Sequence, residues 1–277
     1  MMFGDSIPLK AFHVHDWRRG VVRRGEISGD TLSALSGGRV DYAVAVEVNR
    51  MLFGGYDRII SVGQVVPHEV VGMANYTKNL VVGVGGSDLI NKSHFLGAAA
   101  GIEHILGRAD TPVRRLFNHA VETFLADLPV TYILTVIEQD YESRELHLRG
   151  FFSGTEPEVF DAACRLAGRV NITLLDREPD RIVVYLDPDE FCSTWLGNKA
   201  VYRARMAVAD DGELIVLAPG LKEFGEDAVI DRLIRRFGYR GTAATLEAVE
   251  DDGELRANLG AAAHLIHGSS EGRFRIT

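Results

Sequence analysis

The 277-residue sequence contains only two cysteines, Cys164 and Cys192, both in apolar surroundings. Two cysteines are too few for a disulfide framework or a cysteine-type zinc site, so we expect both to be small core residues. No apolar run reaches the roughly 18 residues that a membrane span needs. The first residues also lack the basic-then-apolar order of a signal peptide. These absences make the cytoplasm the expected location.

A basic face is also lacking, because the chain carries a net charge of -9. A nucleic-acid partner needs clustered Lys and Arg against its phosphates, so this charge argues against one. Arginine occurs in isolated pairs that we expect to be solvated faces or ion-pair partners: Arg18-Arg19, Arg23-Arg24, Arg114-Arg115 and Arg235-Arg236. Lysine is scarce, with five against twenty-five arginines, so a lysine is not simply the default cation.

Short apolar runs alternate with stretches of helical spacing along the chain. The runs that predict strands are rich in Val, Ile and Leu and cover residues 42–46, 58–62, 80–84, 131–137, 181–186 and 213–218. Helical spacing covers residues 88–106, 112–126, 156–170, 199–209 and 228–237. Residues 138–150, charged and reversing between strand-like runs, predict a hairpin. The alternation predicts an α/β fold with mostly parallel sheets flanked by helices.

A polar, proline-bearing link at residues 175–180 is the best candidate for a domain boundary. We therefore expect an amino-terminal cofactor-binding and catalytic domain over residues 1–178 and a carboxy-terminal α/β domain over residues 179–277. The active site is expected in the cleft between them. Residues 1–14 offer no first strand, and Thr277 directly follows a strand-like run. One interpretation is that both domains are incomplete at these ends and that the chain is a segment of a longer protein.

His68, Lys78 and His94 lie in one glycine-rich stretch, ten and sixteen residues apart. Imidazole binds Ni, Zn, Cu or Fe and moves protons near neutral pH, and a desolvated lysine amine can become a covalent nucleophile. His68 also follows a predicted strand, at the end where α/β sheets collect ligands. A lone loop histidine is more often bonded to a nearby carbonyl, but the neighbouring Lys78 and His94 weaken that alternative. The stretch therefore indicates a metal or cofactor site.

The turn Gly83-Val84-Gly85-Gly86-Ser87 opens the predicted helix that carries His94. Backbone N–H groups at such a turn can face a phosphate at a helix N-terminus. The turn matches neither a Walker A motif nor a complete dinucleotide fingerprint. A tight turn that needs glycine explains it equally well.

Three further groups of residues could carry function. His264 and His267 stand three apart and could hold a metal on one helical face, although a helix that ends at Gly268 explains them better. The run His13-Val14-His15-Asp16 is either metal-binding or a strand with alternate exposure. Lys199 stands at a predicted helix start, where a cation is electrostatically unfavourable. It is therefore either simply solvated or placed to reach an anionic substrate across a cleft.

The stretch from Ser61 to His94, with Pro67-His68, Lys78 and Gly85-Gly86, resembles the nickel-pincer lactate racemase family. The resemblance extends from about residue 46 to residue 268, and the helix start at residues 197–200 fits the family's second domain. It implies a pyridinium thioamide/thiocarboxylate mononucleotide that grips nickel and is covalently attached to Lys78. It also implies that His94 ligates nickel, that His68 is a catalytic acid/base and that Lys199 binds the substrate carboxylate. Cofactor-synthesis enzymes and a small hydroxy acid are the partners that it implies.

The reaction that the resemblance implies is racemisation or epimerisation of a 2-hydroxy acid. The Cα–H is too weakly acidic for easy proton removal, so it leaves as hydride to the cofactor while a histidine takes the hydroxyl proton. Return of the hydride to the other face of the flat 2-keto acid inverts the centre.

The sequence departs from the family at several positions. A Gly-x-His-Arg-Pro-like motif with the second acid/base histidine and an Asp-x-Thr-Arg-Pro-like motif are absent, and both are expected upstream of residue 1. Residues Asn75-Tyr76-Thr77 replace the family's usual Gly-Gly before the lysine, and Leu196 replaces a polar side chain. These changes favour a larger hydroxy acid or a sugar acid over lactate.

Two alternatives stay open. A zinc-dependent hydrolase or lyase that uses His68 and His94 needs at least one more ligand, and the sequence nominates none. A non-catalytic relative that binds a nucleotide or a metal is favoured by the missing second histidine. The intact Lys78 disfavours it, because a covalent tether has little use without turnover.

Overall fold

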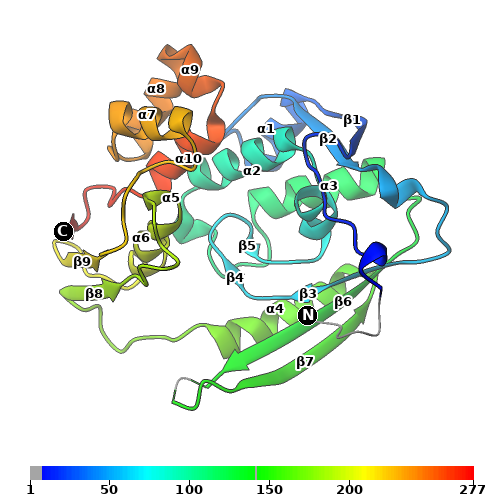
Figure 1. Cartoon of the computed structure of the whole chain (residues 1–277), viewed down its shortest axis with the longest axis horizontal. Helices are drawn as coiled ribbons and strands as arrows, with labels where there is room; N and C mark the ends of the chain where they lie inside the picture. Colours follow the sequence, from blue (N-terminus) through cyan, green and yellow to red (C-terminus); the bar gives the residue numbers. More distant parts are fainter. Residues whose placement is uncertain (1–7, 141) are drawn as a thin grey trace.

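The computed structural model describes residues 8–140 and 142–277, which form two groups of strands and helices joined by an extended connection (Figure 1). Both three-stranded sheets contain parallel strand pairs and are flanked by helices, so the predicted α/β class is confirmed. No helix in these described ranges is both long and apolar enough to cross a membrane. The expectation about residues 1–14 falls partly outside the described residues; from residue 8 to residue 14 there is one 3₁₀ turn, η1 (Leu9–Ala11).

The first three-stranded sheet has the order β3-β6-β7. Strand β3 (Ile59–Gln64) runs parallel to β6 (Val130–Gln139), whereas β6 and β7 (Leu146–Gly154) form the antiparallel hairpin that the charged reversal predicted. Alternate side chains of β6 are buried in the core that α4 (Pro157–Asn171) covers, as the two-residue period of a strand requires. The sheet therefore has one covered face, beneath α4.

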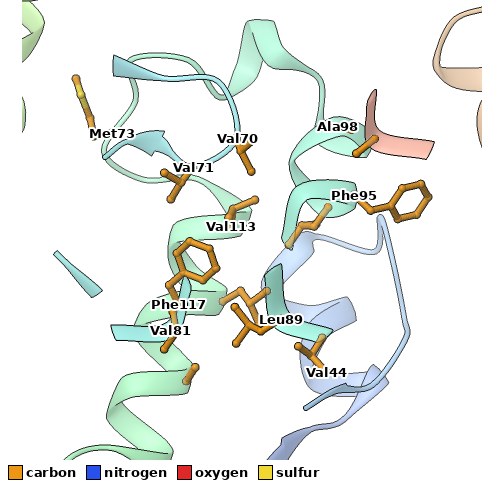
Figure 2. Packing of buried hydrophobic residues seen from close by; sticks show 14 of the residues in the cluster. Val44, Val70, Val71, Met73, Val81, Leu89, Phe95, Ala98, Val113 and Phe117 are labelled. Carbon is orange, nitrogen blue, oxygen red and sulfur yellow. The ribbon is translucent and has the colours of Figure 1, made fainter. Parts of the chain in front are cut away.

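Two small antiparallel pairs and three helices complete the amino-terminal part. Strand β1 (Val21–Ile27) pairs with β2 (Val44–Asn49), and β4 (Pro67–His68) pairs with β5 (Gly72–Met73). The helices are α1 (Gly29–Ser36), α2 (Ser87–Ala100) and α3 (Pro112–Phe124), with short 3₁₀ turns η2 (Arg50–Phe53) and η4 (Ile102–His104). Figure 2 shows how side chains from α2, α3, β2 and the β4–β5 segment meet, including Leu89, Phe117, Val44 and Val71. This packing anchors the β4–β5 segment between α2 and α3.

The strand predicted at residues 80–84 is wrong. Residues Asn79–Gly83 form a one-turn π-helix, η3, which packs against α2, α3 and β2. Leu80 and Val81 are buried there, so the apolar run does belong to the core, but as a helical turn and not as a strand. Short apolar runs carry no usable period, because a buried strand and a buried helical turn have the same composition.

The second three-stranded sheet has the order β10-β9-β8 and is parallel throughout. Its strands are β8 (Arg181–Tyr185), β9 (Glu213–Leu217) and β10 (Arg275–Ile276), the last at the strand-like run before Thr277. Helices α5 (Thr194–Gly197) and α6 (Lys199–Ala204) lie between β8 and β9, and α6 ends sooner than the predicted helix at 199–209. A small core of seven buried residues joins this layer: Ile102, Val201, Tyr202, Ala204, Val208, Leu214 and Phe274.

The remaining helices gather at one end of the molecule (Figure 1). They are α7 (Ala228–Phe237), as predicted, followed by α8 (Thr242–Asp251), α9 (Gly253–Arg256) and α10 (Leu259–His267). Helix α10 packs along α2, so these carboxy-terminal helices share the larger core with the amino-terminal part. The proposed boundary after residue 178 lies in the connection between the two sheets, and the division into two domains stays a proposal.

Candidate functional site

His68 ends the two-residue strand β4, where the chain turns toward β5. Its Nδ1 accepts a hydrogen bond from the Val70 backbone N–H at 3.1 Å, so the neutral ring carries its proton on Nε2. The hairpin is tightly held at Gly72, which has a φ of 90° and a Cβ position only 2.1 Å from the Arg108 carbonyl oxygen. Only glycine fits such a position, and the histidine on the opposite strand is therefore held in place.

Lys78 follows a turn with two consecutive left-handed residues, Asn75 (φ 73°) and Tyr76 (φ 59°). They fall in the stretch Asn75-Tyr76-Thr77, where the resembling family usually carries Gly-Gly, and glycine suits a left-handed backbone. Here Asn75 Oδ1 accepts from the Tyr76 N–H at 2.7 Å, and the Tyr76 ring stacks on Phe160 with centroids 4.9 Å apart. The replacement of the glycines is thus compensated by side-chain contacts, and the turn is kept.

The Lys78 amine is half-buried, and no hydrogen bond or ion pair to it occurs within residues 8–140 and 142–277. Burial lowers its pKa first, the charge of Arg114 lowers it further, and Glu69 raises it. A lysine with a lowered pKa has a larger fraction of neutral, nucleophilic amine at neutral pH.

His94 lies on α2, near the middle of the helix. Its Nδ1 lies 2.6 Å from the Ile90 carbonyl oxygen, which can only accept, so the proton is on Nδ1 and the Nε2 lone pair is unused. Burial lowers the pKa of His94, while the Ile90 bond raises it. A neutral imidazole with one nitrogen bonded to a carbonyl and the other free is the usual form of a metal-ligating histidine.

The four predicted site residues come together. The pKa of His68 is lowered to about 2, first by burial and then by the charges of Lys78, His94, Arg114 and Lys199. Screened charges influence one another only over short distances, so these groups share one neighbourhood. Lys199 begins α6, in the part of the chain that follows the connection. The cleft between two domains stays a prediction.

A cavity of about 560 Å³ is lined by Pro67 and Glu69, the neighbours of His68 in the sequence, but not by His68 itself. Leu106, Arg203, Met206 and residues 171–175 of the connection also line it. Its lining contains apolar side chains and charges of both signs.

Two residues of this neighbourhood carry no signal in the sequence. Glu69 directly follows His68, and its charge raises the pKa of Lys78, His94 and His267. Arg114 was expected on a solvated face or in an ion pair, and this is wrong because it is 2% exposed. Its guanidinium donates to Met73 O at 2.6 Å, to Thr77 Oγ1 at 2.8 Å and to Asn75 O at 3.2 Å. It therefore ties down the segment before Lys78, whereas its neighbour Arg115 forms the expected ion pair with Asp110.

The other histidine groups do not form metal sites. In the part of the chain that the structure describes, no three His, Cys, Asp or Glu side chains are arranged to hold a metal ion. His15 is not in a strand; its Nε2 bonds to Gly85 O and its Nδ1 to Asn49. The helix with His264 and His267 ends at Gly268, as predicted. His267 is 4% exposed, and its Nε2 has no partner among the described residues.

The glycine turn before α2 is explained by close packing. A Cβ on Gly85 would lie 1.9 Å from Val81 O, and one on Gly86 would lie 2.5 Å from a Glu47 carboxylate oxygen. Asp88 occupies the first turn of the helix. Two carboxylates at the helix start oppose a phosphate, so the tight-turn interpretation holds.

Similarity to known proteins identifies the amino-terminal part. Residues 26–103 match the family model of the lactate racemase N-terminal domain. Over this segment the chain is similar to lactate racemase. His68, Lys78 and His94 lie inside the matched segment, and Lys199 lies beyond it.

Two solved structures share the fold of this lactate racemase-like chain. A Thermotoga maritima protein from the Northeast Structural Genomics Consortium aligns with a TM-score of 0.81 and 23% identity, over 96% of this chain and 67% of its own. The lactate racemase apoprotein from Thermoanaerobacterium thermosaccharolyticum aligns with a TM-score of 0.60 and 13% identity, over 95% of this chain and 58% of its own. The lactate racemase-like chain thus spans about two thirds or less of these relatives. No curated protein matches it.

Proposed function

We propose that this chain carries the cofactor-binding part of a racemase or epimerase of 2-hydroxy acids that uses a nickel-pincer nucleotide attached to Lys78. The observation that carries the proposal is the unpaired, half-buried Lys78 amine in the same neighbourhood as His94, which presents an unused nitrogen. A lysine for covalent attachment and a neutral imidazole for the metal are the two protein groups that such a cofactor needs.

The residues present fit this group. Lys78 has no competing partner among the described residues, and its lowered pKa favours acylation of the amine. His94 has its Nδ1 proton fixed on Ile90 O, which leaves Nε2 as the metal-facing nitrogen. When bound, the nickel-pincer nucleotide supplies a hydride acceptor and donor, a chemistry that no side chain provides.

The remaining roles belong to His68 and Lys199. The ammonium group of Lys199 binds the carboxylate of the hydroxy acid from the far side of the cleft. His68 presents its Nε2–H to the substrate oxygen and orients it. Nε2 can take up the hydroxyl proton only after the ring proton has moved to Nδ1, and this move breaks the hydrogen bond from the Val70 N–H. His68 is thus a catalytic acid/base whose proton affinity depends on its surroundings.

Attachment at Lys78 itself changes those surroundings. The charge of Lys78 is the largest electrostatic contribution that lowers the pKa of His68. With the cofactor held at Lys78 as an uncharged amide-type linkage, this charge would be absent and the pKa of His68 would be higher, although burial, the largest cause, would still lower it. Lys78 would thus influence the proton affinity of His68 as well as hold the cofactor.

Two features favour a substrate larger than lactate. Lactate carries only a methyl group on its carbinol carbon, whereas a cavity of about 560 Å³ lies against Pro67 and Glu69, which flank His68 in the sequence. Leu196, at the polar position of the resembling family, is 41% exposed. A hydroxy acid with a longer side chain, or a sugar acid, fits these features better.

The test is intact-protein mass spectrometry with nickel analysis on protein co-expressed with cofactor-synthesis enzymes. We expect a nucleotide-sized adduct on Lys78 together with bound nickel. Lys78→Arg should abolish the adduct, and His94→Ala should keep the adduct but lose nickel. Lys92→Arg is the matched control, because Lys92 is paired with Asp88 and should not affect the adduct. An unmodified, nickel-free wild-type chain would refute the proposal.

The zinc alternative lacks support from the donor set. Zinc sites in hydrolases take three protein ligands, and the described residues contain no such group. A nickel-pincer nucleotide needs one protein ligand, which His94 supplies.

A further inference from the structure

His264 lies on α10, away from the four cleft residues, yet it contacts the segment that carries Lys199. Its ring is 4% exposed, and both nitrogens have partners. Nδ1 lies 3.1 Å from the Tyr202 hydroxyl, while Nε2 lies 3.2 Å from Asn198 Nδ2 and 3.0 Å from the Tyr239 hydroxyl. One imidazole thus joins α10 to three residues of other segments.

Two of these partners bracket Lys199. Asn198 precedes it directly, and Tyr202 follows it by three residues on α6. Helices α5 and α6 are four and six residues long, far shorter than a helix that is stable alone. The direction of the Lys199 side chain therefore depends on tertiary contacts, and His264 provides two of them from a single ring.

The hydrogen bonds define the form of the ring. Asn198 Nδ2 can only donate, so Nε2 of His264 accepts and Nδ1 carries the proton toward the Tyr202 oxygen. Burial lowers the pKa of His264 to about 4, which keeps the ring neutral. The ring also packs on Trp195 with centroids 4.8 Å apart. A glutamine offers one acceptor and one donor group, whereas a phenylalanine keeps only the packing.

We propose that His264 is a positioning residue: its hydrogen bonds to Asn198 and Tyr202 fix the segment that carries Lys199, and with it the position of the Lys199 amine. The inference rests on the proposed function only for the identity of the anion that Lys199 binds. The hydrogen bonds that position Lys199 do not depend on it. A purely structural role would stabilise α10 without changing the environment of Lys199 in particular.

The experiment is competitive acetylation of the full chain with an amine-reactive acetyl ester, read by peptide mass spectrometry. The labelling rate of Lys199 is expressed relative to that of Lys222, which is exposed. We expect His264→Phe to raise the relative rate of Lys199 several-fold, because the half-buried amine becomes more accessible when its segment loosens, and we expect the rate of Lys78 to stay unchanged. His264→Gln should restore the wild-type rate.

Thr245→Val is the matched control, since it removes a buried hydrogen bond, to Gly241 O, on the neighbouring helix α8 without touching Asn198 or Tyr202. It should leave the Lys199 rate unchanged. An unchanged rate in folded His264→Phe, or an equal rise in Thr245→Val, would overturn the inference. If His264→Phe does not fold, Tyr202→Phe removes only one bond and must still raise the rate. Absence of an adduct on Lys78 would refute the proposed cofactor but would leave this result unaffected.

Discussion

Replacement of Arg114 by methionine should destabilise the protein strongly and also change Lys78. The guanidinium makes three hydrogen bonds with the segment before Lys78 and packs over the Phe160 ring at 4.4 Å, and it forms no ion pair with a carboxylate of the described residues. Hydrogen bonds to a charged group contribute about 1.5–3 kcal/mol each, so three are worth about 4–9 kcal/mol. Desolvation of the buried charge, several kcal/mol, offsets part of this gain. We therefore expect Arg114→Met to lower the free energy of unfolding by about 3 kcal/mol.

Urea unfolding followed by circular dichroism measures this loss. With a slope of about 3 kcal/mol per M, the midpoint should fall by about 1 M. Arg115→Met is the matched control: Arg115 is the exposed neighbour, paired with Asp110, and such pairs contribute at most about 1 kcal/mol.

The second readout is the pH midpoint of Lys78 acetylation. Since the charge of Arg114 lowers the pKa of Lys78, removing it should move that midpoint to higher pH. The reasoning fails if Arg114→Met unfolds at the same urea concentration as Arg115→Met, or if the Lys78 midpoint moves down.

Three further predictions concern other buried groups. His267→Leu should stabilise the apoprotein by about 1 kcal/mol in urea unfolding, because it removes a buried nitrogen without a partner; a loss of 2 kcal/mol or more would show that the nitrogen is bonded. Acid should destabilise the protein as the pH falls below about 6.5. Burial lowers the folded-state pKa of His264 to about 4, of His267 to about 3 and of His68 to about 2, so these three histidines bind about three more protons in the unfolded chain. The free energy of unfolding in urea should be lower at pH 5 than at pH 7, and this difference should be smaller in His267→Leu. Equal free energies at the two pH values would contradict the prediction. Tyr76→Gly should be more stable than Tyr76→Ala by about 1 kcal/mol, since only glycine adopts a φ of 59° without strain; the opposite order in thermal unfolding would refute the left-handed turn.

The parts of the fold that the sequence predicted are those with a clear period or turn chemistry. Helix α7 and the β6–β7 hairpin lie where they were expected, because their polar and apolar residues alternate over a long enough run. The run at residues 80–84 is too short for that and is a π-helix. Its geometry depends on the helices packed around it.

The candidate site could be located from the sequence only in part. His68, Lys78 and His94 stand out through their spacing, and the structure brings Lys199 to them from the other part of the chain. Arg114 could not be found, because an arginine next to another arginine on a helix is the usual pattern of a surface. Its burial depends on the carbonyls of Met73 and Asn75, which face it only after the turn has formed.

The left-handed pair Asn75–Tyr76 also limits the order in which substitutions in and around this turn are tolerated. A tyrosine that replaces glycine at residue 76 brings backbone strain of about 1 kcal/mol at once. The gain arises only where its ring finds a slot, here formed by Tyr132 and Phe160. A substitution at residue 76 before the slot exists is therefore a loss, and one that follows it is tolerated. A tyrosine at residue 76 is therefore tolerated only when Tyr132 and Phe160 are already in place.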